Sequence, residues 1–133
     1  MKVKEIMNKP VETLDRNDTL SLAEELMTMK RIRHLPVLED GRLVGIVTQR
    51  DLFRAGLSTA MGFGKKAQKE FMKTVFVKEV MTEEVVTIGP EADVKEAARI
   101  MLEKKIGCLP VVDSGKLLGL ISETDLVRLV VGA

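Results

Sequence analysis

The sequence of 133 residues has no tryptophan, no tyrosine, one cysteine and one histidine. Without Trp or Tyr it lacks the aromatic platform on which single-stranded nucleic-acid binders stack bases. His34 is the single histidine, so no second histidine exists with which it could build a zinc site. No acid–base pair or activated nucleophile occurs at a recognisable spacing. We therefore expect no enzymatic activity, no catalytic residue and no metal site.

Long apolar runs are also missing. No run approaches the ~20 residues needed to cross a bilayer, so we expect no membrane partner. The first residues lack the apolar stretch of a secretion signal, and the solitary Cys108 cannot form an internal disulfide. These features predict a cytoplasmic protein. The formal net charge of +1 argues against a nucleic-acid partner.

An internal repeat dominates the sequence. Shifting the chain by 74 residues aligns residues 3–55 with 77–129 without a gap, and 19 of the 53 pairs are identical. The repeat predicts three parts: a first repeat at 1–56, a connector with a short helix at 57–76, and a second repeat at 77–133. We expect a loop from Gly56 to Gly64 and a helix from Lys65 to Lys73, with Phe63, Phe71 and Phe76 anchoring this joint.

Each copy predicts the order strand, helix, strand, strand, helix, a mixed α/β (α+β) fold built from two β-α-β-β-α repeats. The leading extended pieces are expected at Val11–Leu14 and Val85–Ile88. Asp18 or Thr19 can cap the first helix. Pro36 implies a strand edge or a strand's first residues, and Asp40-Gly41 is typical of a hairpin turn. The expected buried helix faces contain Leu22, Leu26, Met27 and Met29 in the first copy, and Val94, Ala97, Ala98, Met101 and Leu102 in the second.

One heptapeptide recurs where a buried strand is expected to turn into a helix: Gly45–Asp51 matches Gly119–Asp125. In one interpretation, Thr48 and Ser122 are helix N-caps answered by Asp51 and Asp125 three residues later. In another, the free amides of the helix start and the hydroxyl attract a phosphate, while the carboxylate accepts hydrogen bonds from a sugar diol. Both interpretations can hold together.

These patterns resemble a tandem pair of CBS domains, the cystathionine-beta-synthase type repeat, also called a Bateman module. The resemblance rests on Leu35-Pro36-Val37 and Leu109-Pro110-Val111, on the turn glycines Gly41 and Gly115, and on the recurring Gly-x-x-[Thr/Ser]-x-x-Asp. It implies a pseudo-twofold arrangement of two repeats packed as one CBS pair. It also implies two clefts that bind adenosine derivatives, namely AMP, ADP, ATP or S-adenosylmethionine.

The resemblance assigns roles to residues of both copies. It implies that Asp51 and Asp125 hold ribose hydroxyls, and that Thr48 and Ser122 contact phosphate. Adenine is then expected beside Val11, Thr13, Arg33, His34 and Pro36 in one cleft, and beside Val85, Thr87, Gly107, Cys108 and Pro110 in the other.

The two clefts are not expected to be equivalent. Arg33, His34 and Arg50 stand where the second copy has Gly107, Cys108 and Thr124. Arginine makes strong charge-assisted bonds to phosphate, so we expect the first cleft to prefer phosphorylated nucleotides and the second a less charged adenosine compound or nothing. The alternatives are that His34 is an ordinary half-exposed residue, that Cys108 is a small buried hydrophobe, and that the arginines are surface ion-pair partners.

These inferences predict a non-enzymatic regulatory sensor that binds an adenosine-containing small molecule, forms a homodimer and acts on an unknown regulated protein. One alternative is a structural dimerisation or assembly module without a ligand. Another is weak nucleic-acid binding through the basic connector, which contains Lys65, Lys66, Lys69 and Lys73.

Overall fold

The structure, a computed structural model, describes residues 1–60 and 64–132. The chain divides into two units that cut across the sequence repeat. Glu12–Val85 forms what we call the first-copy unit, and Met1–Val11 together with Val86–Ala133 forms the second-copy unit. Each unit therefore takes a segment from the other copy of the repeat.

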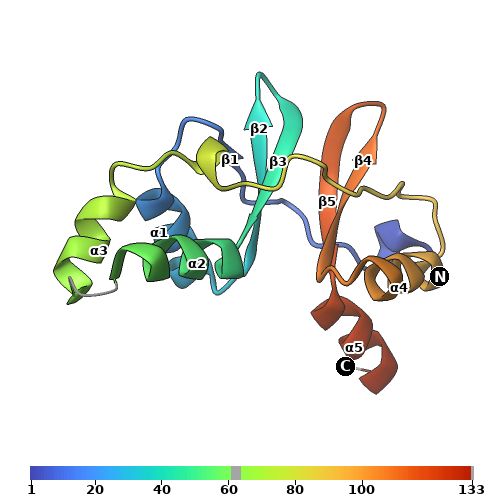
Figure 1. Ribbon diagram of the computed structural model, residues 1–133. Helices are drawn as coiled ribbons and strands as arrows, with labels where there is room; N and C mark the ends of the chain where they lie inside the picture. The colour runs from blue at the N-terminus through green and yellow to red at the C-terminus, as the bar shows by residue number, and fades with distance from the viewer. Residues whose placement is uncertain (61–63, 133) are drawn as a thin grey trace. The chain divides into compact units, whose positions relative to one another are not determined.

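The first-copy unit is a three-stranded sheet flanked by helices (Figure 1). Strand β2 is central; it pairs parallel with β1 and antiparallel with β3. The contacts among α1, α2 and α3 put α3 against the other two helices, which themselves contact the sheet. The elements are β1 (Leu14–Asp15), α1 (Leu20–Lys30), β2 (His34–Glu39), β3 (Arg42–Thr48), α2 (Gln49–Ala60), α3 (Gly64–Met72) and the 3₁₀ helix η2 (Val77–Glu79).

The second-copy unit repeats this plan with a smaller sheet, in which β4 and β5 form an antiparallel hairpin and α4 and α5 contact it (Figure 1). The leading strand is reduced to one parallel bridge between Ile88 and Val111. The elements are η1 (Val3–Glu5), α4 (Val94–Lys104), β4 (Cys108–Asp113), β5 (Lys116–Ser122) and α5 (Glu123–Val131). The prediction of a mixed α+β fold is confirmed, although the regular strand β1 begins only at Leu14.

Turn chemistry fixes both hairpins. Asp40 and Gly41 have φ values of 50° and 78°, and Ser114 and Gly115 have 51° and 78°. Two consecutive positive φ angles are typical of the type I′ turn, whose twist suits a two-residue hairpin.

Pro36 is fully buried in the central strand β2. A proline has no backbone N–H to donate, but the pairing of β2 with β1 starts only at Val37, so no hydrogen bond to β1 is lost at Pro36.

The two 3₁₀ helices belong to segments that cross between the sequence copies. We call residues 1–11 the first leader and residues 75–85 the second leader. In the first leader, the Val3 amide donates to the Ala92 carbonyl at 2.8 Å; in the second, the Val77 amide donates to the Asp18 carbonyl at 2.7 Å. Both valines are fully buried. Each leader is thus a hydrogen-bonded, packed part of the unit in which it lies.

The buried faces of the helices differ in part from expectation. Thr19 caps α1 by accepting from the Leu22 amide, as predicted, but Leu22 and Met29 are 38% and 69% exposed. The buried face of α1 is formed by Leu20, Ala23 and Met27. At 3.6 residues per turn, Leu22 lies about 200° around the helix from Leu20, on the side away from the sheet.

Helix α4 shows the same pattern. Val94, Ala97 and Met101 are buried as expected, Ala98 is half-buried, and Leu102 is 81% exposed. The prediction was therefore wrong for Leu102, as it was for Leu22 and Met29.

The joint between the copies is more helical than predicted. Helix α2 continues to Ala60, so the expected loop from Gly56 is helical over its first residues, whereas the predicted short helix is present as α3. Met72 is the buried anchor of α3, Phe71 is half-buried and Phe76 is 42% exposed; Phe63 lies outside the described residues. Within residues 1–60 and 64–132, none of the helices combines the length and the apolar character that crossing a membrane requires.

Candidate functional site

The first candidate corner is where β3 ends at Thr48 and α2 begins. The Thr48 amide donates to Oδ2 of Asp51 at 2.8 Å, and the Asp51 amide donates to Oγ1 of Thr48 at 3.2 Å. This reciprocal pair satisfies two backbone donors at the helix start. The helix-cap interpretation of Thr48 and Asp51 is confirmed.

The second corner has the same capping box at the junction of β5 and α5. The Ser122 amide donates to Oδ2 of Asp125 at 2.7 Å, and the Asp125 amide donates to Oγ of Ser122 at 3.4 Å. The Ser122 hydroxyl is also 3.0 Å from Oδ2, within hydrogen-bonding distance. Asp125 is 9% exposed, whereas Asp51 is half-buried.

A third residue contacts the second corner and was missed by the sequence reasoning. The side-chain amide of Asn8, in the first leader, donates to Oδ2 of Asp125 at 2.8 Å. Backbone pairing positions it, since the Asn8 amide donates to the Leu120 carbonyl at 2.9 Å and the Leu120 amide returns a bond at 3.1 Å. Asn8 and Asp125 are 117 residues apart, and nothing near Asn8 in the sequence indicates this contact.

The glycine of each corner makes room for a leader. A Cβ on Gly119 would lie 2.7 Å from Sδ of Met7 and 2.9 Å from the Asn8 carbonyl oxygen. A Cβ on Gly45 would lie 2.8 Å from Cγ of Met81 and 3.1 Å from a backbone oxygen of the second leader. The glycine shared by the two heptapeptides is therefore explained by the close approach of a leader, both its methionine side chain and its backbone.

Two of the residues expected beside the first corner, Arg33 and His34, lie at the start of β2. His34 is directly opposite Thr48 in the ladder, and the Gln49 amide donates to the Arg33 carbonyl at 2.9 Å. Arg33 and Arg50 are exposed, and His34 is half-buried. Arg50 is therefore next to the first corner in the sequence, and Arg33 is next to it through the hydrogen bond to Gln49.

The second corner has the matching backbone with different chemistry. Cys108 is opposite Ser122, and the Glu123 amide donates to the Gly107 carbonyl at 2.9 Å. Burial, followed by the negative charge of Glu123, raises the pKa of the Cys108 thiol to about 12. Cys108 is 6% exposed, which agrees with its interpretation as a small buried hydrophobe. Thr124, at the position of Arg50, is half-buried.

The predicted adenine-contacting residues fall into two groups. Pro36 and Pro110 are buried within β2 and β4, opposite Ile46 and Leu120. Thr13 and Thr87 immediately precede the residues that pair parallel with those strands, so both lie beside their own corner's strand. Val11 and Val85 do not share a unit with their own copy's corner, because each lies in the other unit.

The backbone at each helix start is less available to an anion than expected. The amides of Gln49 and Asp51 already donate to Arg33 and Thr48, and those of Glu123 and Asp125 donate to Gly107 and Ser122. These four amides therefore have partners within the folded chain. A phosphate at the first corner would gain charge-assisted hydrogen bonds from the neighbouring arginines.

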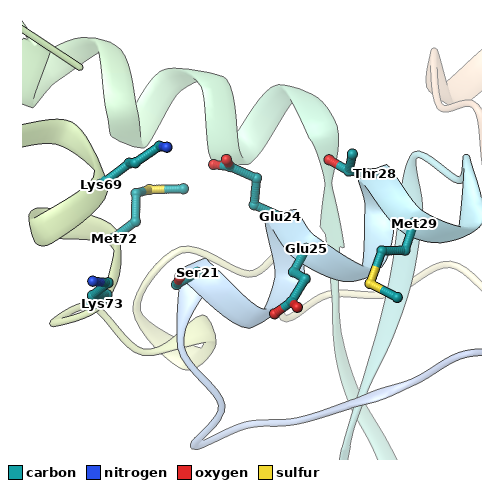
Figure 2. A pocket seen from close by; sticks show the side chains of 8 residues that line it. All are labelled: Ser21, Glu24, Glu25, Thr28, Met29, Lys69, Met72 and Lys73. Atoms are coloured by element: carbon teal, nitrogen blue, oxygen red, sulfur yellow. The ribbon is translucent and has the colours of Figure 1, made fainter. Parts of the chain in front are cut away.

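A separate groove lies between α1 and α3 of the first-copy unit, with a volume of about 380 Å³. Figure 2 shows Lys69 and Met72 of α3 facing Glu24 of α1 across it. None of the residues lining it is expected at an adenosine cleft, although Lys69 and Lys73 belong to the basic connector; the lining consists of Ser21, Glu24, Glu25, Thr28, Met29, Lys69, Met72 and Lys73. In the described part of the chain, no three His, Cys, Asp or Glu side chains are grouped as a metal ion would need.

Comparison with known sequences identifies a family. The CBS domain family matches residues 3–58 and 77–132. A CBS domain-containing protein of Dictyostelium discoideum is 34% identical over 131 residues, spanning 97% of this chain and 90% of that protein. An inosine-5′-monophosphate dehydrogenase of Korarchaeum cryptofilum is 36% identical over 118 residues, but the match spans only 22% of that enzyme and 88% of this chain.

Comparison with solved structures gives the same architecture. The CBS domain pair of protein MJ0100, solved in complex with 5′-methylthioadenosine and S-adenosyl-L-methionine, has a TM-score of 0.81 and 29% identity, and the match covers 99% of this chain and 97% of that one. CBSX2 in complex with AMP has a TM-score of 0.79 and 29% identity, with 98% and 96% covered.

Proposed function

Because this chain belongs to the CBS domain family and carries two CBS domains in tandem, we propose that it is a non-enzymatic regulatory module that binds an adenosine derivative. The observation that carries the proposal is the duplicated corner, in which a carboxylate is held beside a helix-capping hydroxyl and the start of a neighbouring strand. Structurally similar CBS pairs bind 5′-methylthioadenosine with S-adenosyl-L-methionine in one case and AMP in another.

The chemistry of the corner suits a nucleoside. An ionised carboxylate accepts hydrogen bonds only, and a ribose presents two neighbouring hydroxyl donors. In each corner the capping amide orients this carboxylate through Oδ2 of the aspartate. Asp51 and Asp125 are thus proposed to hold ribose, and Thr48 and Ser122 to lie toward the ligand's anionic end.

The first corner is proposed to prefer phosphorylated ligands. Arg33 and Arg50 supply positive charge there, beside His34, where the second corner has a glycine, a threonine and a cysteine at the matching positions. Exposed guanidinium groups bind phosphate through paired donors that amides and thiols lack. AMP, ADP or ATP is therefore proposed for the first corner, and an uncharged or cationic adenosine compound such as S-adenosylmethionine for the second.

Regulation requires a difference in affinity between two conformations. A ligand that binds one arrangement of the chain better shifts the population toward it and alters the surface that a partner protein reads. The partner is proposed to be a protein in the same cytoplasmic compartment, and the module to act as a homodimer.

Thermal melting tests the proposed ligand binding. A ligand that binds only the native state at a hundred times its dissociation constant adds about 2.7 kcal/mol to the free energy of unfolding, which raises Tm visibly. We expect AMP, ADP or ATP to raise Tm through the first corner. If these three nucleotides, S-adenosylmethionine and NAD all leave Tm unchanged, the proposal is wrong.

Matched variants assign the binding to a corner. Asp51→Asn and Asp125→Asn remove the charge while keeping an oxygen that can accept the capping amide, so the helix start remains supported. We expect each variant to lower the affinity of its own corner about tenfold or more, because a hydrogen bond to a charged group is lost. Asp113→Asn, at the exposed end of β4, is the control and should bind like the wild type.

The absence of Trp and Tyr provides a second readout. The purified chain absorbs almost nothing near 280 nm, so co-purified nucleotide would appear as an isolated peak near 260 nm. Extraction and chromatography of that material would identify the ligand directly.

The capping boxes favour one competing function, a purely structural assembly module. Thr48, Asp51, Ser122 and Asp125 already have partners in the folded chain, and helix capping alone would account for them. This function predicts that both Asn variants lower the stability slightly and that no adenosine compound changes Tm.

A further inference from the structure

The two aspartates carry different numbers of hydrogen bonds on the same oxygen. Oδ2 of Asp125 lies within hydrogen-bonding distance of the Ser122 amide (2.7 Å), the Ser122 hydroxyl (3.0 Å) and the Asn8 side-chain amide (2.8 Å). A carboxylate oxygen has about two lone-pair positions. The Ser122 hydroxyl can rotate toward a ligand, so the two donors that stay on Oδ2 are the Ser122 backbone amide and the Asn8 side-chain amide, and together they fill it.

The first corner has no counterpart of the Asn8 bond. The position that matches Asn8 in the repeat is Thr82, whose backbone makes the equivalent bridge to β3 at Ile46, with bonds of 3.0 and 2.9 Å. Among the residues that the structure describes, no hydrogen bond joins the Thr82 side chain to Asp51. The backbone frame is thus the same in both corners, and the side chain at this one position differs.

We propose that Asn8 is a specificity-determining residue that makes the second corner bind ribose through one hydroxyl where the first corner binds it through two. This inference rests on the function proposed above. A neighbouring pair of hydroxyls donates best when each hydroxyl reaches a separate carboxylate oxygen. The Asn8 amide occupies Oδ2 of Asp125, which leaves Oδ1 for a single hydroxyl.

The consequence is a difference in sugar selectivity between the corners. A site that hydrogen-bonds both hydroxyls discriminates strongly against a ligand lacking one, because a charged acceptor then loses its partner. At a site whose second carboxylate oxygen already accepts from Asn8, a ligand that lacks one hydroxyl leaves no carboxylate oxygen without a donor. The second corner should therefore accept 2′-deoxyadenosine nearly as well as adenosine, and the first should not.

Reciprocal exchange of the two leader residues tests this. Asn8→Thr in the Asp51→Asn background reports on the second corner, and Thr82→Asn in the Asp125→Asn background reports on the first. Calorimetric titration of the full chain with adenosine and with 2′-deoxyadenosine measures both affinities. The quantity compared is the affinity for adenosine divided by the affinity for 2′-deoxyadenosine at each corner. We expect Asn8→Thr to raise the ratio at the second corner about tenfold, and Thr82→Asn to lower it at the first by a similar factor.

Asn17→Thr is the matched control, because Asn17 is an exposed asparagine outside both corners, and it should leave both ratios unchanged. Circular dichroism checks that every variant is folded. Thr82→Asn is expected to add a hydrogen bond at the first corner, and Asn8→Thr removes one at the second. Because the two exchanges act on different corners, each tests the role of this position separately.

The possible outcomes separate the two proposals. Adenosine binding with ratios that do not respond to either exchange overturns the role of Asn8 and leaves the proposed function intact. A response to Asn17→Thr of equal size also overturns it. If neither corner of the wild type or of any variant binds adenosine or a nucleotide, the proposed function fails and the role of Asn8 fails with it.

Discussion

At the scale of single residues, Gly119 and Gly45 show how closely the leaders pack on the sheets. The nearest atoms to a Cβ on Gly119 include the Asn8 carbonyl oxygen at 2.9 Å, which is backbone and cannot rotate away. The same glycine precedes the capping serine by three residues, so its position in the sequence associates it with the corner. Its structural role is instead to admit the leader that carries Asn8.

Replacing Gly119 by alanine should therefore destabilise the second-copy unit. We expect Gly119→Ala to lower the free energy of unfolding by about 1–3 kcal/mol, the usual cost of forcing an extra methyl group into a packed site. Urea unfolding followed by circular dichroism measures this, since the chain has no Trp for fluorescence. Gly89→Ala is the control, because a Cβ there has no heavy atom within 4 Å. Equal effects of the two substitutions would contradict the packing argument.

Cys108 gives a second prediction at this scale. Burial raises the pKa of its thiol to about 12, so at pH 8 only about one molecule in ten thousand carries the reactive thiolate. We expect a disulfide reagent to label the native protein at least about a hundredfold more slowly than the protein in urea. The labelling rates with and without urea test this, and similar rates would show that the thiol is accessible in the folded chain.

At the scale of elements, the first leader is held by charge as well as by packing. Nζ of Lys2 and Nζ of Lys4 lie 2.6 and 2.7 Å from the two carboxylate oxygens of Glu91. Hydrogen bonds from both lysines lower the pKa of the Glu91 carboxyl to about 2, and the same pairing raises the pKa of Lys2. Because all three side chains are exposed, salt screens the cluster and its effect on stability is small.

This cluster predicts an acid-sensitive leader. A carboxyl whose folded-state pKa is depressed contributes stability above its ordinary pKa of 4.5, and the contribution is lost as the pH falls toward 2. We expect Glu91→Gln to be less stable than the wild type at pH 6, and the difference to shrink as the pH is lowered and as salt is added. Urea midpoints at several pH values measure it.

Glu103→Gln, an exposed substitution on α4, is the control for that series. A difference between wild type and Glu91→Gln that persisted unchanged at pH 2 would contradict the charge argument.

The sequence predicted the positions of helices, strands and turns better than it predicted which side of each helix is buried. Thr19 as a cap, the Asp40-Gly41 turn and the strand–turn–helix corners depend on residues a few positions apart, and all are present. Leu22 and Leu102 were placed on buried faces because they fall near one face of a helix with other apolar residues, yet both are exposed. Which side of an amphipathic helix is buried depends on what packs against it, and local periodicity does not specify that when apolar residues lie on more than one side.

At the scale of the whole molecule, the exposed apolar residues support the proposed homodimer. Val127, Val130 and Val131 on α5 are 60%, 87% and 73% exposed. A cluster of large apolar side chains on one helix is costly to leave in water, and a second copy of the chain could cover it.

We therefore expect the wild-type chain to elute at twice its mass of 14.8 kDa in size-exclusion chromatography with light scattering, and the double variant Val127→Asp, Val130→Asp to elute as a monomer. Met29→Asp on α1 is the control at another exposed apolar residue and should remain dimeric. A monomeric wild type, or a double variant that stays dimeric, would contradict this role for α5.

The sequence by itself determined the repeat, the order of elements, the hairpin turns and the capping boxes. The repeat is visible when the chain is aligned with itself, and the turns and capping boxes follow from backbone preferences and side-chain contacts within a few residues.

Only the tertiary structure decided which leader packs with which copy, and that Asn8 reaches Asp125 across 117 residues. The two leaders share the sequence Val-Lys-Glu and make equivalent backbone bonds, so local chemistry gives no preference for either unit. That choice depends on burying the apolar residues of both leaders at once, which is a property of the folded chain as a whole.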